Sequence, residues 1–111
     1  MAQIDYVELP SADMAATAAF LGAAFGWGMV DYGPSYRAFT GAGLDGGIDG
    51  TGTGTGPLVI LKTADLVACE AAVRAAGGVI TMPPYDFPGG RRFHFREPGG
   101  NVLAVWAEPV G

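Results

Sequence analysis

The spacing of apolar residues changes twice along the chain between a strand-like and a helix-like period. Short aliphatic runs at residues 4–9 and 58–61 indicate β-strands. Each run is followed by apolar residues three or four positions apart, which is the period of one helix face. These positions are Met14, Ala18, Leu21 and Phe25 after the first run, and Leu66, Cys69, Val73 and Ala76 after the second. The pattern therefore predicts a strand followed by a helix at two places.

Both predicted helices have polar residues at their start and glycine at their end. Ser, Thr and Asp side chains cap helices because their oxygens accept hydrogen bonds from the first unpaired backbone amides. The candidates are Ser11 or Asp13 for the first helix and Thr63 or Asp65 for the second. Glycine at position 26 and at positions 77–78 is expected to end the helices, because glycine adopts the left-handed conformation at little cost.

Further short segments with the composition of strands follow each helix. They cover residues 29–32, 36–39 and 44–48 in the first half, and residues 79–82, 92–96 and 102–106 in the second. Residues 83–90 are so rich in proline and glycine that we expect a loop, long enough to cover a site. The TGTGTG run at 51–56 is typical of a flexible connector.

The two halves align when the chain is shifted by 52 residues, so that Asp13 falls on Asp65 and Gly26 on Gly78. Self-similarity of this kind indicates a duplicated structural unit. We therefore predict an α+β fold with two βαβββ modules in a single domain. The predicted parts of residues 1–111 are module one at about 3–49, a Gly/Thr linker at 50–56 and module two at about 57–108.

Charge and composition narrow the classes of function. The 111 residues carry a net charge of −5, from six basic and eleven acidic side chains, and nucleic-acid binding is disfavoured because it depends on basic surface. No apolar stretch approaches the roughly 20 residues of a membrane-spanning helix. There is no leader-like start, and the single cysteine cannot form an internal disulfide. We expect a soluble cytoplasmic protein with no nucleic-acid or membrane partner.

Three stretches of the chain resemble the vicinal oxygen chelate superfamily of glyoxalases, bleomycin-resistance proteins and extradiol dioxygenases. They are IDYVELPSAD near the start, AFLGAAFGW at the end of the first predicted helix, and GGRRFHFREPGGNVLAVW at 89–106. The resemblance spans nearly the whole chain. It implies paired βαβββ units whose mixed sheet curls around an open cavity, usually completed in a homodimer.

The resemblance also locates the positions at which metal-using members carry His, Gln or Glu ligands. These positions fall on Tyr6, on Pro57 or Leu58, on Ala104 and near residues 46–48. None of these side chains is a usual ligand for a divalent metal. The one histidine, His94, lies on the strand before the expected last ligand position. We therefore expect a lost metal site and no cofactor.

Strand alternation selects the residues that would face the cavity. Tyr6 and Glu8 share one face of the first strand, and the repeat places Leu58 and Ile60 at the equivalent positions. In a largely apolar cavity, Glu8 is a candidate general base or a counter-charge for a cationic ligand. The alternative is a structural Glu8, paired with an arginine or exposed at the strand end.

In the second half, His94 shares a face with Arg92, while Phe93 and Phe95 face the other way. His94 and Arg92 are candidates for contact with an anionic or carbonyl group, or else belong to a polar outer face. A second set of candidates would supply aromatic or hydrogen-bonding contacts, with a core or dimer-interface position as the alternative for Trp106. This set is Trp106, with Ala104 on its face, Tyr36, and Tyr85 from the predicted loop.

Three functions are compatible with these residues. The first is a metal-independent, small-molecule-binding protein like the bleomycin-resistance members, sequestering a planar or cationic compound. The second is a glyoxalase-like lyase or isomerase acting on a small carbonyl compound, with Glu8 as base and His94 or an arginine as electrophile. The third is a structural or regulatory domain whose cavity is filled by its own side chains. We expect a homodimer in each case, because one 111-residue chain supplies half of the usual arrangement.

Overall fold

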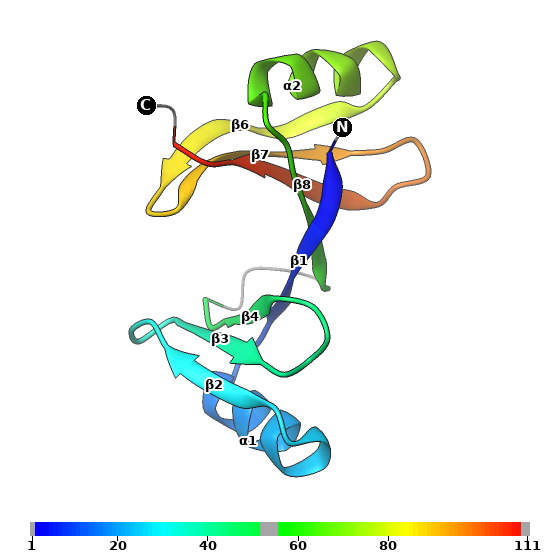
Figure 1. Cartoon of the computed structure of the whole chain (residues 1–111). Coiled ribbons are helices and arrows are strands. Elements are labelled where there is room, and N and C mark those ends of the chain that lie inside the picture. The colour runs from blue at the N-terminus through cyan, green and yellow to red at the C-terminus, as the bar shows by residue number, and fades with distance from the viewer. Residues whose placement is uncertain (1, 52–55, 110–111) are drawn as a thin grey trace. The chain divides into compact units, whose positions relative to one another are not determined.

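A computed structural model describes residues 2–51 and 56–109 of the chain, which divides into two compact units. The first unit comprises Tyr6–Leu58. The second unit begins at Val59 and also includes the start of the chain up to Asp5. Strand β1 (Gln3–Pro10) therefore contributes to both: its first residues belong to the second unit and the rest to the first (Figure 1).

The first unit contains one helix and a four-stranded mixed sheet. After β1 follow α1 (Met14–Phe25), β2 (Gly28–Asp31), β3 (Tyr36–Thr40) and β4 (Gly46–Asp49). The strand order is β2-β3-β4-β1. Strand β1 runs parallel to β4, whereas β2–β3 and β3–β4 are antiparallel pairs. Helix α1 lies on one side of this sheet (Figure 1).

The second unit has the same order of elements and the same pattern of pairing. Its elements are β5 (Leu58–Lys62), α2 (Leu66–Ala75), β6 (Val79–Phe87), β7 (Gly90–Arg96) and β8 (Val102–Ala107). The strand order is β5-β8-β7-β6, with β5 parallel to β8 and the other pairs antiparallel. The predicted α+β fold of two βαβββ modules is confirmed.

Equivalent aspartates begin the two helices. Asp13 and Asp65 each accept a hydrogen bond from the backbone amide three residues on, at 3.0 and 3.1 Å. The hydroxyl two residues before each aspartate instead accepts from the amide of the aspartate itself, at 3.0 and 3.3 Å. Asp13 and Asp65, rather than the preceding Ser and Thr, are therefore the caps. Gly26 ends α1 in the predicted left-handed conformation, with φ of 73°.

The core of the first unit lies between α1 and its sheet. Ala18 and Leu21 from the helix pack with Phe39 and Ile48, and all four are less than 10% exposed. The Trp27 ring extends this core, with its centroid 5.1 Å from that of Phe39. Burial of these apolar side chains fixes which face of the sheet the helix covers.

A glycine allows the closest approach in this core. A Cβ on Gly46 would lie 2.3 Å from the Phe39 ring and 2.4 Å from the backbone oxygen of Val7. The backbone oxygen belongs to the neighbouring strand and cannot rotate away. The sheet can therefore bring β4 under Phe39 only because position 46 has no side chain.

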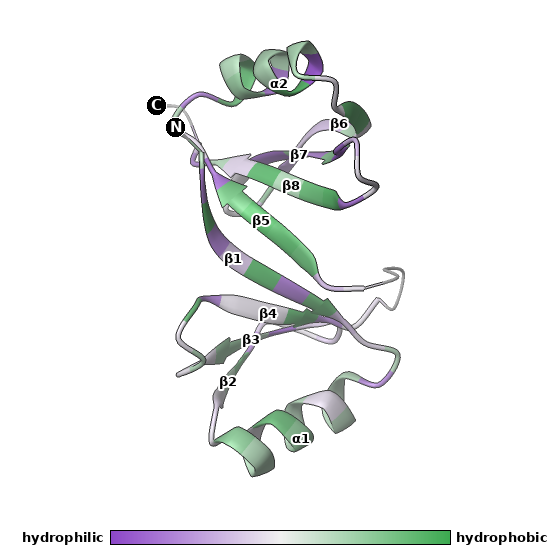
Figure 2. Cartoon of the chain, turned by 90° about the vertical axis from the view of Figure 1, so that its right-hand side faces the viewer, coloured by the Kyte–Doolittle hydropathy of each residue, from purple (hydrophilic) through white to green (hydrophobic). Residues whose placement is uncertain are grey.

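The core of the second unit is built on Phe93 and Val105, which are opposite each other on β7 and β8 and are 0% and 1% exposed. Helix α2 packs against β6, β7 and β8. Figure 2 shows hydrophobic residues along β5 and β8. Alternation along β7 places Phe93 on the face opposite to Arg92 and His94, as predicted.

The prediction of a loop at residues 83–90 is wrong. Strand β6 continues through this segment to Phe87, and only a two-residue turn separates it from β7. The pairing of β6 with β7 shifts between Ile80 and Met82 and again between Met82 and Tyr85. Such irregularities accommodate prolines in an edge strand, because a proline there removes no bond that the sheet needs.

The other predicted strands lie within one or two residues of the observed bounds. Most of the predicted connector at 51–56 lies outside the described residues. Within the described parts of the chain, neither helix has the length and apolar character needed to cross a membrane.

Candidate functional site

The first unit carries two tyrosines and a glutamate in contact on the sheet face opposite α1. Leu9 on β1 packs on the α1 core, so the alternating residues Tyr6 and Glu8 point to the other face. The hydroxyl oxygens of Tyr6 and Tyr36 are 2.5 Å apart, and the Tyr36 hydroxyl donates to Glu8 Oε2 at 3.3 Å. The fold thus brings together three of the predicted site residues.

A second glycine makes this arrangement possible. Gly47 lies opposite Glu8 in the β1–β4 pair, and a Cβ on it would be 2.2 Å from the Tyr36 hydroxyl. The Tyr36 ring therefore lies across the glycine and reaches β1. Any larger residue at position 47 would displace the ring and separate its hydroxyl from Glu8.

The direction of each hydrogen bond follows from the number of protons that each hydroxyl carries. A phenol has a single O–H donor, and since Tyr36 donates to Glu8, Tyr6 donates to Tyr36. Burial raises the pKa of Tyr6 and of Tyr36, so both hydroxyls keep their protons at neutral pH. The Glu8 carboxylate is the accepting end of this chain, which we call the Tyr–Tyr–Glu chain.

The second unit brings three other residues together on the sheet face opposite Phe93. The Tyr85 hydroxyl accepts a hydrogen bond from Arg92 Nε at 2.5 Å and lies 2.9 Å from His94 Nε2. Tyr85 lies in strand β6, directly opposite Arg92, and not in a loop as predicted. The tautomer of His94 decides whether Tyr85 or His94 donates in the bond between them.

Aromatic and cationic side chains continue this face. The Arg92 guanidinium carbon lies 5.7 Å from the Tyr85 ring centroid and 5.8 Å from that of Phe87. The Phe87 and Trp106 rings meet edge to face with centroids 6.1 Å apart. Lys62 Nζ lies 5.0 Å from the Trp106 centroid. The predicted residues Arg92, His94 and Trp106 therefore belong to one continuous surface of polar and aromatic groups.

The three apolar residues predicted to contact a ligand lie on β5 and β8. Ile60 and Ala104 are opposite each other in the parallel pair and are 3% and 0% exposed. Leu58 is half-buried at the start of β5. Their contact with a ligand remains a prediction.

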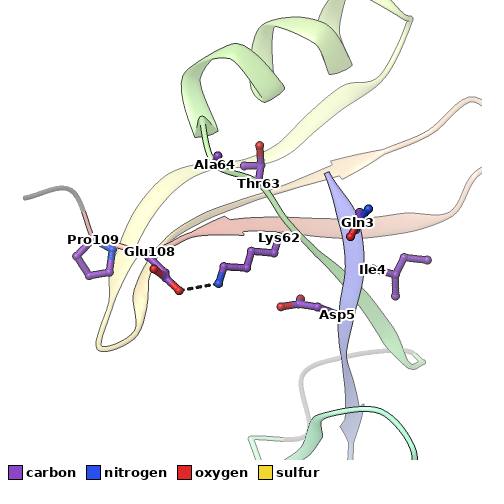
Figure 3. Close-up of a pocket in the computed structure, with 8 residues that line it drawn as sticks. All are labelled: Gln3, Ile4, Asp5, Lys62, Thr63, Ala64, Glu108 and Pro109. Atoms are coloured by element: carbon purple, nitrogen blue, oxygen red, sulfur yellow. Dashed lines mark hydrogen bonds and ion pairs between the residues drawn. The ribbon is translucent and has the colours of Figure 1, made fainter. Parts of the chain in front are cut away.

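An open pocket of about 590 Å³ adjoins the Lys62 end of this polar and aromatic surface (Figure 3). Gln3 and Asp5 from β1 line it, together with Lys62 and Glu108, which form an ion pair at 2.6 Å. Asp5 also accepts a hydrogen bond from Trp106 Nε1 at 3.1 Å. Two residues of the pocket lining, Lys62 and Asp5, contact Trp106. None of the predicted site residues lines the pocket.

The residues at the positions implied for metal ligands do not fit a divalent ion. Tyr6 has the only polar side chain among them, and its hydroxyl is already bonded to Tyr36 and protonated. Ala104 and the residues of β4 near Ile48 offer no donor atom in their side chains. Within residues 2–51 and 56–109, no three His, Cys, Asp or Glu side chains are grouped so that they could hold a metal ion.

Some residues of these faces were not identified from the sequence. Trp106 also contacts Lys62, Phe87 and Asp5. These contacts depend on strand register and on the extension of β6, which were not predicted from the sequence. The alternation of Tyr85 and Phe87 beyond the two prolines is the signal in the sequence that could have revealed this part of β6.

Comparison with known families and structures relates this geometry to other proteins. The sequence model of the Glyoxalase/Bleomycin resistance protein/Dioxygenase superfamily matches residues 3–105. A comparison with curated proteins found no match. The fold is similar to that of a superfamily member from Vibrio splendidus 12B01, with a TM-score of 0.77 and 14% identity over 97% of this chain and 100% of the other.

Two further solved structures share the fold. The Mn(II)-bound glyoxalase from Novosphingobium aromaticivorans has a TM-score of 0.70 and 21% identity, over 96% of this chain and 40% of the other. Methylmalonyl-CoA epimerase from Mycobacterium tuberculosis has a TM-score of 0.69 and 16% identity, over 97% and 88%. Since the family match covers both βαβββ modules, the chain belongs to the Glyoxalase/Bleomycin resistance protein/Dioxygenase superfamily, as its resemblance predicted.

Proposed function

We propose that this chain is a metal-independent member of the superfamily that binds a planar or cationic small molecule and sequesters it without converting it. The observation that carries the proposal is the Tyr–Tyr–Glu chain of the first unit. It fixes a carboxylate beside two aromatic rings on the sheet face that α1 leaves uncovered.

The chemistry of this group favours a cation with a flat body. The Glu8 carboxylate supplies a negative charge that the Tyr36 hydroxyl holds in one orientation. The faces of Tyr6 and Tyr36 are electron-rich, and a cation positioned over such a ring gains about 0.5–2 kcal/mol. Glu8, Tyr6 and Tyr36 are all half-buried, so the charge acts with less screening than it would in open water.

Metal independence is supported by the donor set. The first-strand position holds a tyrosine that donates a hydrogen bond to Tyr36, and the last-strand position holds Ala104. A divalent ion needs several imidazole, carboxylate or thiolate ligands. The glyoxalase from Novosphingobium aromaticivorans is described with bound Mn(II), and the proposal sets this chain apart from it.

The test uses ethidium as a planar cationic probe, titrated calorimetrically in the presence of EDTA. We expect saturable binding, and Glu8→Gln is expected to weaken it at least tenfold, or about 1.4 kcal/mol, because the variant keeps the shape and removes the charge. Glu70→Gln is the matched control, since it removes the same charge from an exposed ion pair on α2.

Equal affinity in both variants would remove Glu8 from the site. Dependence of binding on added Zn²⁺ or Mn²⁺ would contradict metal independence. A Glu8→Gln variant that loses its cooperative melting transition would assign Glu8 a structural role.

A second candidate function is that of a glyoxalase-like lyase or isomerase acting on a small carbonyl compound, with Glu8 as general base. It is favoured by the pairing of a carboxylate with a phenol that keeps its proton, because such a pair supplies a base and a hydrogen-bond donor together. The similar structures include an enzyme described as an epimerase. Exchange of a carbon-bound hydrogen of methylglyoxal–glutathione adduct with D2O, lost in Glu8→Gln, would favour this function over sequestration.

We also propose that the protein is a homodimer. Large apolar side chains remain exposed in the single chain, among them Phe20 at 62%, Phe25 at 60% and Val67 at 77%. Burial of such side chains is the main favourable contribution to association. Light scattering at micromolar concentration is expected to give twice the mass of 11.3 kDa, and a monomer would contradict the proposal.

A further inference from the structure

Two opposite charges on the wall of the open pocket contact the same tryptophan without pairing with each other. Asp5 accepts a hydrogen bond from Trp106 Nε1 at 3.1 Å, and Lys62 Nζ lies 5.0 Å from the centroid of the Trp106 ring. Figure 3 shows both side chains extending into the same space. Within residues 2–51 and 56–109, Lys62 forms its ion pair with Glu108, and Asp5 forms none. Trp106 thus holds a carboxylate and an ammonium near each other but beyond ion-pair distance.

Both charged groups have hydrogen-bonding capacity beyond the contacts they make within the chain. An ammonium has three N–H donors, and Glu108 accepts from one of those of Lys62 at 2.6 Å. The two oxygens of Asp5 share a single indole N–H, at 3.1 and 3.3 Å, although a carboxylate can accept about four hydrogen bonds. The exposed side-chain amide of Gln3, which also lines the pocket, has no hydrogen bond to another described residue. The pocket therefore offers acceptors at Asp5 and donors at Lys62 and Gln3.

The rest of the lining is mainly apolar. Ile4, Ala64 and Pro109 contribute to it, and all three are exposed in the single chain. The volume of about 590 Å³ lies within the range of about 300–1,000 Å³ that is usual for small-molecule sites. Such sites combine an apolar wall with a few polar groups that fix the orientation of the ligand. This pocket has that composition, and two of its polar groups carry opposite charges.

We infer that the pocket binds a free α-amino acid with an aliphatic side chain. The ammonium of the ligand would donate to Asp5, and its carboxylate would accept from Lys62 and Gln3, because hydrogen bonds between charged groups are stronger than neutral ones. The aliphatic side chain would lie against Ile4 and Pro109 and cover part of their apolar surface.

The arrangement of charges disfavours ligands that carry only one of the two groups. A lone ammonium bound here would be repelled by Lys62, and a lone carboxylate would be repelled by Asp5. An α-amino acid carries both charges on one carbon atom and can therefore satisfy both side chains together. This inference goes beyond the proposed function and does not rest on it, because every residue that lines the pocket belongs to the second unit.

Three ligands with the same aliphatic body separate the two charges. L-leucine has both, 3-methylbutylamine is leucine without the carboxylate, and 4-methylpentanoate is leucine without the ammonium. The indole N–H of Trp106 reports binding in NMR titrations, and that of Trp27, the other tryptophan of the chain, is an internal reference in the first unit. We expect leucine to shift only the Trp106 signal and to bind at least tenfold more tightly than either analogue.

Two outcomes of these titrations would overturn the inference. The first is equal affinity for leucine and one of the analogues, because a single charge would then be enough for binding. The second is a Trp106 signal that does not saturate with leucine, or that shifts together with the Trp27 signal.

Two aspartates of the second unit provide matched variants. Asp5→Asn keeps the shape of the side chain and an oxygen for the Trp106 indole but removes the charge, and it is expected to lower leucine affinity at least tenfold. Asp86→Asn should leave the affinity unchanged, because it removes the same charge from an exposed ion pair with Arg91 on β6 and β7. Equal losses in both variants would show attraction to the overall charge and would overturn the site.

The ion pair of Lys62 with Glu108 gives a second test, which also covers the case in which Asp5→Asn fails to fold, as judged from its circular dichroism. Lys62→Gln and Glu108→Gln break the same ion pair, but only Lys62→Gln removes the ammonium. We expect Lys62→Gln to lower leucine affinity at least tenfold and Glu108→Gln not to lower it. Equal losses would mean that the ion pair acts only on the structure of the pocket and would overturn the inference.

Discussion

The two units share one chain path but carry their charged site residues on different strands. In each unit the first strand runs parallel to the last, which pairs with the third, so residues can be matched by register. The matched pairs are Glu8 and Ile60, Gly47 and Ala104, Ala38 and His94, and Tyr36 and Arg92. The first unit thus has Glu8 on its first strand, whereas the second has Arg92 on its third strand and Lys62 at the end of its first.

This difference shows that the fold sets where side chains can meet but leaves their chemistry open. Position 47 is a glycine because the Tyr36 ring crosses it, whereas the matched position 104 holds an alanine. The carboxylate of the first unit is supported by a phenol, and the guanidinium of the second is also supported by a phenol. One scaffold therefore presents an anion and a cation in similar settings, and a fold with this property supports many ligands.

The largest expected effect comes from exchanging the matched first-strand residues. Ile60 is 3% exposed, so Ile60→Glu would bury a charge and is expected to lower the free energy of unfolding by about 3–5 kcal/mol. Glu8→Ile should lower it by less than about 1 kcal/mol, because Glu8 is only half-buried. Urea denaturation of both variants measures the difference. Similar losses would mean that the two positions are equivalent in environment as well as in register.

A smaller loss is expected from adding one methyl group to the first unit. Gly46→Ala would force Cβ against Phe39 and against the backbone of Val7, with an expected cost of about 2–3 kcal/mol. The matched position in the second unit already holds Leu103, which lies opposite Val59. Gly56→Ala is the control, since no atom lies within 4 Å of its Cβ. A Gly46→Ala variant as stable as this control would contradict the close packing of β4.

The helix caps should show that the units are alike where their sequences are alike. Asp13→Ala and Asp65→Ala each remove one side-chain bond to a backbone amide and are each expected to cost about 1 kcal/mol. Thermal melting followed by circular dichroism gives both values. If only one of the two variants loses stability, the two aspartates do not contribute equally to capping, although their positions in the repeat are equivalent.

The smallest effect concerns the stability of the first unit at alkaline pH. Burial raises the pKa of Tyr6 and Tyr36 in the folded chain, so above about pH 10 the unfolded chain loses their protons first. Their contribution to stability is therefore complete below pH 10 and declines as the pH rises further. Absorbance at 295 nm should show two tyrosines ionising at a higher pH in the folded chain than in the urea-unfolded chain, and Tyr36→Phe should reduce the decline. Ionisation at the same pH in both states would contradict their burial.

The elements and their caps could be predicted from the sequence because they depend on local spacing. Strand and helix periods and Gly26 identify their own role within a few residues, and the caps were narrowed to Ser11 or Asp13 and to Thr63 or Asp65. The full length of strand β6 could not be predicted, since Pro83 and Pro84 oppose strand formation unless the strand lies at a sheet edge. That position depends on the topology of the whole unit.

The candidate site was predictable only where it depends on alternation. Counting along β1 places Tyr6 and Glu8 on the same face. Tyr36 could be predicted as a site residue, but its hydrogen-bond partners could not. The contacts of Lys62 and Phe87 with Trp106 depend on register between strands that are distant in sequence. Register is fixed by the packing of both sheet faces.

The path of β1 has a consequence for the inheritance of the fold. A cut at the connector would yield two gene fragments with matching βαβββ order, as expected of a duplicated ancestor. The second fragment would nevertheless lack Gln3–Asp5, which belong to its unit, and Trp106 would lose the carboxylate that its indole contacts. The two halves are therefore copies in pattern but are no longer independent parts. Recombination within this protein would preserve a complete unit only if the opening strand moved with the closing half.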